Sequence, residues 1–188
     1  MAQHKPIYAF LGPEGTFSDQ AVRTFVSKGR LAAAYEPLPC DSMSDVFEAV
    51  DRGKADYGVV PIENSLEGPV TTVLDAFAFT TRAEILGEVA LDIHQSLILA
   101  KGAALDDVTA IASHPQGIGQ CRRWLNRHLP DRQLRIADST AAAVAMAVED
   151  ASVAAVGSTL AAELMGADVY EEAIEDNLSS QTRFVLIG

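Results

Sequence analysis

YGVVPIENSLEG, residues 57–68, is the stretch that decides the fold class of this chain. Its first half is a short continuous apolar run, which is typical of a strand buried on both faces of a parallel sheet. Its second half turns polar at Glu63, Asn64 and Ser65. Open parallel sheets bind ligands outside the carboxyl ends of their strands, so these side chains stand where a ligand would lie. Pro69 then suits the first position of a helix. The same pattern also fits an ordinary turn in which Asn and Ser only cap that helix.

Two more strand–helix units precede this stretch. Residues 7–11 and 35–38 are apolar strands, and each is followed by a helical pattern. In the first unit a glycine-containing loop leads to the helix, with Thr16 as a candidate cap, and it lacks the lysine of a nucleotide-binding P-loop. In the second unit Ser42 is a candidate cap. Three such units in succession predict a parallel sheet with right-handed crossovers.

A long alternating pattern follows over residues 85–99. The residues at every second position, which would share one face of a strand, are mostly apolar: Ile85, Gly87, Val89, Leu91, Ile93, Gln95, Leu97 and Leu99. A strand of that length spans about 45 Å at roughly 3.3 Å per residue. A lobe of about 90 residues has a radius of gyration of roughly 12 Å. The strand therefore either bends sharply or passes from one lobe into another, and we expect the crossing.

Beyond this crossing the strand and helix patterns alternate again. Apolar strands are expected at residues 108–112, 134–137, 153–156, 169–174 and 183–187, and the strand at 169–174 is expected to run towards the first lobe. A helix is expected at residues 117–129. The sequence thus predicts an α/β protein with mostly parallel sheets, a first lobe at 1–84, a second at 85–176 and a return strand to the first lobe at 177–188. Two βα lobes with crossing strands and a cleft between them resemble the type 2 periplasmic-binding-protein fold.

Composition narrows the class of protein. The chain has 188 residues, of which 48% are hydrophobic, and a formal net charge of −12. This charge argues against nucleic acid or an anionic membrane surface as a partner. The opening residues are polar and no apolar stretch is long enough to span a membrane, so we expect no signal peptide and a cytoplasmic protein. Cys40 and Cys121 fit no metal spacing and no disulfide framework, and we expect neither a metal nor a cofactor.

Three separated motifs carry a family resemblance. They are GPEGTFS at residues 12–18, PIENS at 61–65 followed by Gly68, and TRF at 182–184. In these motifs and their order the chain resembles the catalytic region of the prephenate dehydratases. The resemblance implies a carbon–oxygen lyase of phenylalanine biosynthesis, which binds a small dicarboxylate and converts prephenate to phenylpyruvate, carbon dioxide and water. We also expect a homodimer or a higher homo-oligomer.

The resemblance also implies site residues. Thr182 is the leading catalytic candidate, as a hydrogen-bond donor to the departing hydroxyl group. Arg183 is expected to bind a carboxylate as a two-pronged donor. Glu63 and Asn64 match the family's Glu-Asn pair and complete the catalytic set. The expected substrate-binding residues are Thr16, Ser42, Ser65, Ser113, Gln120 and Phe184.

Several alternatives stay open. Without the resemblance, Arg183 would be interpreted as a surface cation paired with Glu175 or Asp176, and polar residues at strand-to-helix junctions as structural caps. The family commonly has Asn at the position of Ser180, and a hydroxyl cannot replace both the donor and the acceptor of an amide. Arogenate is an alternative substrate. A non-catalytic two-lobed module that binds a small anion is the alternative from another functional class.

The position of the last motif sets one more expectation. Members of the family usually continue into an ACT regulatory domain that binds phenylalanine, whereas only four residues follow the TRF motif here. From this sequence we therefore expect no ACT domain, catalytic competence, and no allosteric response to phenylalanine.

Overall fold

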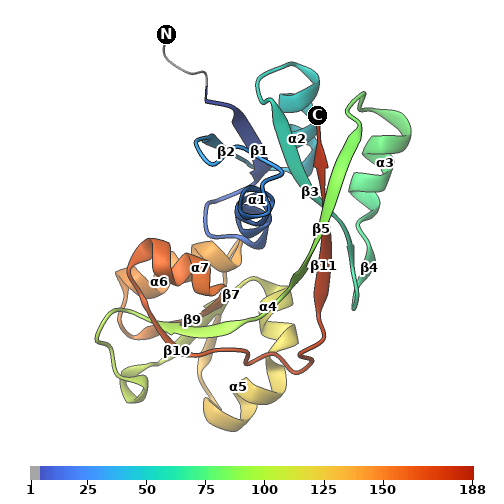
Figure 1. Ribbon diagram of the computed structural model, residues 1–188. Coiled ribbons are helices and arrows are strands. Elements are labelled where there is room, and N and C mark those ends of the chain that lie inside the picture. Colours follow the sequence, from blue (N-terminus) through green and yellow to red (C-terminus); the bar gives the residue numbers. More distant parts are fainter. Residues whose placement is uncertain (1–4) are drawn as a thin grey trace. The chain divides into compact units, whose positions relative to one another are not determined.

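The computed structural model describes residues 5–188 and divides the chain into two compact units (Figure 1). The first unit runs to Pro13 and takes in Phe17–Asp92 and Ser179–Gly188, and the second consists of Glu14–Thr16 and Ile93–Leu178. Residues 1–4, part of the polar opening on which the expectation of no signal peptide rests, lie outside the described residues. Within residues 5–188 no helix is both long and apolar enough to cross a membrane.

The first unit is a mixed sheet with helices packed against it. Its strands are β1 (Ile7–Leu11), β2 (Glu36–Cys40), β3 (Tyr57–Asn64), β4 (Gly68–Pro69), β5 (Ile85–Asp92) and β11 (Gln181–Ile187). Its helices are α1 (Phe17–Ser27), α2 (Met43–Asp51) and α3 (Thr71–Phe79). The strand order is β2-β1-β3-β11-β5, with β4 paired to β3. The three expected strand–helix units form the parallel part, in which β1 pairs with both β2 and β3.

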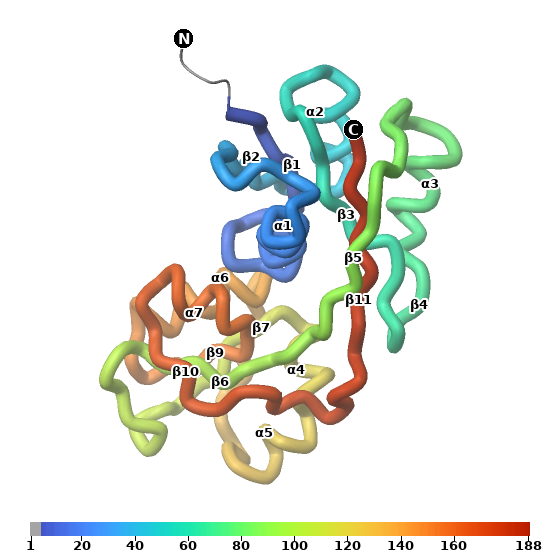
Figure 2. The backbone as a smooth tube through the Cα atoms, in the orientation of Figure 1, coloured from blue at the N-terminus to red at the C-terminus, as the bar shows by residue number. Residues whose placement is uncertain are grey.

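The last strand is the centre of the antiparallel part. β11 runs antiparallel to β3 on one side and to β5 on the other (Figures 1 and 2). Its Val185 and Ile187 belong to an apolar cluster with Val46 and Phe47 of α2 and Val73 of α3. The C-terminal segment therefore joins two strands that lie far from it in the sequence and completes the core of the unit.

The second unit is a five-stranded mixed sheet. Its strands are β6 (Ser96–Leu99), β7 (Ala110–Ser113), β8 (Gln133–Ile136), β9 (Val153–Gly157) and β10 (Asp168–Glu171), in the order β10-β6-β9-β7-β8. Its helices are α4 (Pro115–Gln120), α5 (Arg122–His128), α6 (Thr140–Glu149), α7 (Thr159–Met165) and the short 3-10 helix η1 (Leu105–Asp107). β7 pairs in parallel with β8 and β9, whereas β6 pairs antiparallel with β9 on one side and with the edge strand β10 on the other.

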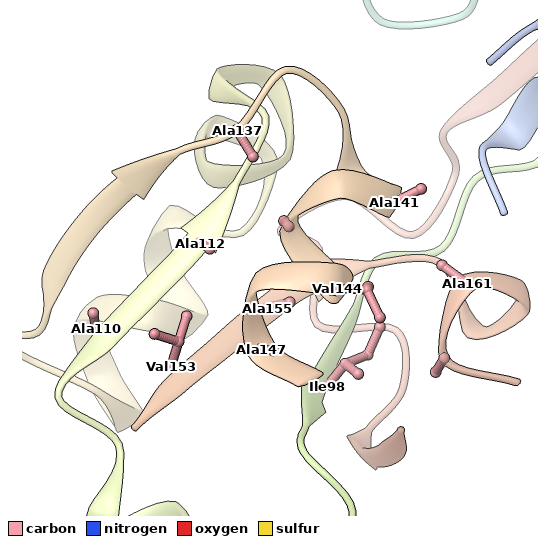
Figure 3. Packing of buried hydrophobic residues seen from close by; sticks show 12 residues of the cluster. Ile98, Ala110, Ala112, Ala137, Ala141, Val144, Ala147, Val153, Ala155 and Ala161 are labelled. Carbon is pink, nitrogen blue, oxygen red and sulfur yellow. The ribbon is translucent and has the colours of Figure 1, made fainter. Parts of the chain in front are cut away.

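Small residues let the second unit pack closely. Ala141, Val144 and Ala147 of α6 lie against Ala155 of β9 and Ile98 of β6 (Figure 3). Alanine loses little side-chain entropy in a helix and lets the helix backbone approach the sheet. The Ala-rich helix of the sequence is therefore buried along one face.

The structure corrects five expectations about elements. Pro69 does not begin a helix: Gly68–Pro69 pairs antiparallel with Asn64 and Glu63 as β4, and α3 begins at Thr71. Residues 85–99 are two strands. β5, which we assigned to the second lobe, belongs to the sheet of the first unit because it pairs with β11, and β6 belongs to the second unit, so the chain passes from one unit into the other within residues 85–99 as expected.

The expected helix over residues 117–129 is two helices, since Cys121 has a non-helical φ of −109° and ψ of 13° and ends α4 where α5 begins. The expected strand at residues 169–174 is β10, which stays within the second unit because it pairs with β6.

Candidate active site

A pair of buried side chains joins the ends of β3 and β11. Asn64 is the last residue of β3, and it lies opposite Thr182 in the register of the two strands. Asn64 Nδ2 donates a hydrogen bond to Thr182 Oγ1 at 2.8 Å, and the two residues are 8% and 9% exposed. The sequence places these residues 118 positions apart, and the antiparallel ladder brings them into contact.

The orientation of the Asn64 amide follows from its other contacts. Asn64 Oδ1 accepts hydrogen bonds from the backbone N–H groups of Leu66 at 2.9 Å and Glu67 at 3.1 Å. The oxygen is thereby committed to the turn that leads into β4, so the NH₂ group must face Thr182. The Asn64 side chain therefore both closes the turn and donates the hydrogen bond to Thr182.

This orientation decides what the Thr182 hydroxyl group can do. Because an amide NH₂ group is only a donor, Thr182 Oγ1 must be the acceptor in this bond. Among residues 5–188 no other hydrogen bond to the Thr182 hydroxyl group is present. Its proton therefore has no acceptor among the described residues. An N–H donor at Oγ1 also stabilises negative charge that develops on that oxygen, which makes the hydroxyl a better donor.

Glu63 and Arg183 form the neighbouring cross-strand pair. Arg183 Nη2 lies 3.0 Å from Glu63 Oε2, and Arg183 Nη1 lies 4.0 Å from Glu88 Oε2 on β5. The side chains of Arg183 and Glu63 are 48% and 51% exposed. An ion pair at this exposure contributes little to stability, on the order of 0–1 kcal/mol. Arg183 therefore pairs with glutamates of β3 and β5, and its partner is neither Glu175 nor Asp176.

The two cross-strand pairs point to opposite faces of β3 and β11. Successive residues of a strand alternate between faces, and in β11 the buried Thr182 and Phe184 flank the exposed Arg183. The register against β3 shifts after Arg183, which leaves Ile62 as the extra residue of a bulge. Bulges re-aim side chains at the ends of paired strands. The four predicted catalytic residues are thus adjacent, but the structure groups them as Asn64 with Thr182 and Glu63 with Arg183.

Ser65 and Ser180 lie at the same end of the sheet. Ser65 Oγ donates to Ser179 O at 3.3 Å and accepts from Gln181 N at 2.9 Å, while Ser65 N donates to Gln181 O at 2.8 Å. Ser65 therefore extends the β3–β11 ladder by one residue. Ser180 is 2% exposed, and its Oγ has no partner among the described residues. The position at which the family commonly has Asn is accordingly a buried hydroxyl group with an unmet hydrogen bond.

In two other predicted substrate-binding residues of the first unit, the side chain is engaged in contacts within the fold. Ser42 is the N-cap of α2: its Oγ accepts from Asp45 N at 3.2 Å and donates to Asp45 Oδ2 at 2.7 Å. Phe184 is 2% exposed within the core. The structure thus uses the polar atom of Ser42 locally, and Phe184 presents almost no surface.

The remaining predicted residues belong to the second unit. Thr16 is 9% exposed and lies next to Gly15, whose carbonyl accepts a hydrogen bond from Ser158 Oγ at 2.6 Å. A Cβ atom at Gly15, where φ is +86°, would lie 2.9 Å from Ala161 Cα, so this loop requires glycine. Ser113 is completely buried, and its Oγ donates to Val156 O at 2.8 Å. The hydroxyl group of Ser113 therefore holds neighbouring strands together.

Gln120 is part of a polar network that the sequence did not reveal. Its Oε1 accepts from Gln95 Nε2 at 3.2 Å, and its backbone carbonyl accepts from Asp176 N at 2.7 Å. Gln95 N donates to Glu175 Oε2 at 2.9 Å, and Glu175 Oε1 lies 2.7 Å from His94 Nδ1. One signal was present: Gln95 is the polar residue in the apolar phase of residues 85–99, and a buried amide needs partners.

The carboxylates of this network act on the neighbouring thiol. Cys121 is fully buried. Burial first, and then the charges of Glu175 and Asp176, raise the pKa of the Cys121 thiol above its ordinary value. A thiol that resists ionisation is a poor nucleophile and a poor metal ligand. Among residues 5–188, no group of three or more His, Cys, Asp or Glu side chains is placed to hold a metal ion.

Comparisons with known proteins match this arrangement to one family. A model of the prephenate dehydratase family matches residues 8–188. A prephenate dehydratase of Mycolicibacterium gilvum (strain PYR-GCK) is 37% identical over 189 residues, which cover 97% of this chain and 61% of that protein. A bifunctional chorismate mutase/prephenate dehydratase of Neisseria gonorrhoeae (strain ATCC 700825 / FA 1090) is 36% identical over 192 residues, which cover 100% of this chain and 51% of that protein.

A solved structure shows the same fold. The crystal structure of a prephenate dehydratase from Arthrobacter aurescens in complex with L-Phe matches with a TM-score of 0.86 and 37% identity, covering 97% of this chain and 60% of that chain. The fold class predicted from the sequence, α/β and like the type 2 periplasmic-binding proteins, is confirmed, but the expectation of mostly parallel sheets was wrong because both sheets are mixed. The chain spans between 51% and 61% of the length of these three relatives. Since the family model covers residues 8–188 and these relatives cover nearly the whole chain, the chain belongs to the prephenate dehydratase family.

Proposed function

We propose that this chain carries prephenate dehydratase activity and that Thr182 is its central catalytic residue. The observation that carries the proposal is the bond from Asn64 Nδ2 to Thr182 Oγ1 at 2.8 Å. It makes the threonine oxygen an acceptor toward the protein and leaves the hydroxyl proton for the substrate. The family membership of the chain supplies the substrate class, a small dicarboxylate with a ring hydroxyl group.

The reaction needs alignment and help with one leaving group. The bond between the ring and its carboxylate breaks, its electron pair enters the ring, the bond from the ring to the hydroxyl oxygen breaks, and the ring becomes aromatic. Carbon dioxide leaves, and the departing hydroxide takes up a proton to become water. Aromatisation supplies the driving force, so the protein must hold the two leaving groups in line and stabilise the oxygen that departs.

Thr182 suits the second task as a hydrogen-bond donor. A threonine hydroxyl group is a weak acid and is poorly matched to free proton transfer near neutral pH. A donated hydrogen bond that strengthens as charge develops on the departing oxygen avoids this mismatch, and the N–H of Asn64 steadies the threonine oxygen meanwhile. If the proton is transferred fully, solvent must return it to Thr182 before the next turnover.

Arg183 remains the candidate for binding a substrate carboxylate, in competition with Glu63, and because it projects from the face of β11 opposite Thr182 it would have to reach that carboxylate around the end of the strand. Its guanidinium is half-exposed and supplies a fork of donors suited to a carboxylate. A substrate carboxylate would have to replace Glu63, which lies 3.0 Å away in an exposed pair that is easily exchanged. Thr16 and Gln120 stay in the proposed substrate-binding set. Ser42, Ser65, Ser113 and Phe184 are left out of it because local contacts account for them.

Location and assembly are further parts of the proposal. We propose a cytoplasmic homodimer or higher homo-oligomer that binds neither nucleic acid nor membranes. The net charge of −12 supports the last two points. For the assembly, the support is a set of exposed apolar side chains on α3 and β5, namely Leu74, Phe79, Ile85 and Leu86. Light scattering of the purified chain during size-exclusion chromatography measures its mass and tests the assembly directly.

Turnover by the purified chain tests the activity. We expect phenylpyruvate to form from prephenate without added metal or cofactor. The same assay with arogenate, followed by formation of phenylalanine, measures the preference between the two substrates. Saturable binding of prephenate without any product would instead support the alternative of a non-catalytic anion-binding module.

A further inference from the structure

The backbone of Gln95 is fixed on both sides. Gln95 lies between β5 and β6 and is 3% exposed. Its N–H donates to the buried carboxylate of Glu175 at 2.9 Å, and its carbonyl accepts from Ile174 N at 2.8 Å. The Gln95 side chain therefore projects from an anchored backbone and is itself buried, which limits the places its carboxamide can reach.

The carboxamide of Gln95 makes one bond and lacks another. Its Nε2 donates to Gln120 Oε1 at 3.2 Å. Its Oε1 is buried and has no partner among the described residues. A buried polar atom without a partner needs a reason, because most such atoms in folded proteins are hydrogen-bonded.

The reason follows from comparing the two orientations of the amide pair. In the observed orientation the carbonyl oxygen of Gln95 and the second N–H of its Nε2 are left unpaired among the described residues. In the reverse orientation Gln120 would donate to Gln95, and the buried NH₂ group of Gln95 would be left with two unpaired N–H groups. Unpaired carbonyl oxygens are tolerated better than unpaired N–H groups. The observed orientation is therefore the favoured one, and the unpaired oxygen is its consequence.

This preference fixes what Gln120 offers to a ligand. With its Oε1 held by Gln95, Gln120 is left with the two N–H groups of Nε2. Nε2 has no hydrogen-bond partner among the described residues and does not occur among their buried unpartnered atoms. Gln120 is thus held as a donor, which matches an acceptor oxygen and does not match an ammonium group.

We propose that Gln95 is a positioning residue of the reaction, which acts only through Gln120. Gln95 keeps the Nε2 atom of Gln120 turned toward the substrate, so that it donates to an acceptor oxygen of the dicarboxylate. This inference rests on the proposed function and on the predicted contact between Gln120 and the substrate. It adds a residue, Gln95, that contacts no substrate itself and a reason for its buried unpaired oxygen.

A double-mutant cycle tests this inference. Gln95→Met keeps the length of the side chain and removes both the bond to Gln120 and the unpaired buried oxygen. We expect KM for prephenate to rise about five-fold with a smaller change in kcat, as for contacting side chains whose coupling is measured in such cycles. In a Gln120→Met background the same Gln95→Met change should leave KM where it was, because its target is gone.

A second variant reverses the donor. In Gln95→Glu the carboxylate can only accept, so Gln120 must donate to it and turn its own oxygen toward the substrate. We expect a larger rise in KM than in Gln95→Met. Thermal unfolding of each variant shows whether it is folded. The ¹⁵N–¹H signals of the Gln120 side-chain amide should shift in Gln95→Met, and they report the amide pair without any turnover.

The outcomes separate the two proposals. An active wild-type chain in which Gln95→Met leaves KM unchanged, or raises it equally with and without Gln120, would overturn the role of Gln95 alone. A folded wild-type chain that does not turn over prephenate would overturn the proposed function, and the catalytic role of Gln95 with it. A loss of the Gln95→Met effect in the Gln120→Met background supports the inference.

Discussion

The Thr182 hydroxyl group accepts a hydrogen bond from Asn64 and donates none to the described residues. Thr182→Val removes the hydroxyl group and preserves the branched shape, so kcat should fall on the order of a hundred-fold while KM changes little, as for a lost transition-state donor. Thr182→Ser, which keeps the hydroxyl group, is the matched control and should retain most of kcat. Steady-state kinetics on the three proteins measures this. A tenfold rise in KM at unchanged kcat would make Thr182 a binding residue.

Asn64 allows a sharper test of the same arrangement. Asn64→Asp can still accept the N–H groups of Leu66 and Glu67, so the turn into β4 should persist. A carboxylate cannot donate to Thr182, and it would take the threonine proton as an acceptor instead. We expect kcat to fall about as far as in Thr182→Val, roughly a hundred-fold, in a chain that folds normally by circular dichroism. Normal turnover in Asn64→Asp would show that the direction of this hydrogen bond does not matter.

Arg183 has two possible partners, the Glu63 carboxylate that it contacts in the structure and a carboxylate of the substrate. Arg183→Lys keeps the charge but loses the fork, so KM for prephenate should rise roughly ten-fold if the guanidinium binds a carboxylate. Glu63→Gln is the control, because it frees Arg183 from its ion pair and should lower KM or leave it unchanged. Near-normal kinetics in Arg183→Lys would assign the residue to the β3–β11 pairing.

Among the elements, local patterns predicted most strands and helices, and non-local contacts decided the rest. The apolar runs of β1, β3, β9 and β11 were visible in the sequence because buried strands read as continuous apolar stretches. The pairing of β11 between β3 and β5 was not visible, because strand partners are chosen by contacts across long sequence separations, 89 residues for Gln181 and Asp92 and 118 for Thr182 and Asn64. The site shows the same division. Sequence motifs predicted Asn64 and Thr182 as site residues, but only the pairing of β3 with β11 showed that they are in contact.

The missed elements have local physical reasons. β4 was predicted as the start of a helix because Pro69 suits that position, and the Asn64 side chain overrode it by closing a turn. Helices α4 and α5 were predicted as one because no glycine or proline separates them at Cys121. Gln95 was included among the apolar positions of residues 85–99. Its hydrogen-bond partners Glu175 and Gln120 become visible only in the folded chain.

The junction between α4 and α5 gives a pH prediction. The pKa of the Cys121 thiol is raised in the folded chain, first by burial and then by Glu175 and Asp176. The folded chain therefore holds this proton more tightly than the unfolded chain, so the contribution to stability is complete below the unfolded thiol pKa of about 8.5 and declines as pH rises above it. The free energy of unfolding should fall above pH of about 8.5, by up to roughly 1.4 kcal/mol per pH unit for this group.

Urea unfolding at several pH values checks this. Cys121→Ala should be less stable at neutral pH, because it leaves a small cavity, and should lose part of the alkaline slope. Cys40→Ala is the control: the pKa of Cys40 is also raised by burial and by Asp45 and Asp41, but that residue is only partly buried. An alkaline slope that is unchanged in Cys121→Ala would contradict the prediction.

For the whole molecule, charge opposes the proposed substrate. The formal net charge is −12, and prephenate carries two carboxylates, so the long-range field repels what the site must bind. Added salt shortens the range of this repulsion to about 10 Å at 0.1 M ionic strength. We therefore expect KM for prephenate to fall as sodium chloride is raised from about 20 to about 150 mM, with kcat unchanged. A rise in KM over this range would show that screening of local donors such as Arg183 outweighs the field of the molecule.

The central place of β11 also has a consequence for how the chain is made. β3 and β5 are synthesised long before β11, and until it arrives each exposes the backbone edge that β11 will cover. The first unit therefore cannot close its sheet during most of synthesis, and pairing over such long sequence separations is slow. Exposed edges invite association with other chains in that interval. A ribosome-bound chain lacking residues 181–187 should thus stay protease-sensitive and bind chaperones that recognise unfolded chains, and release should come with the last strand.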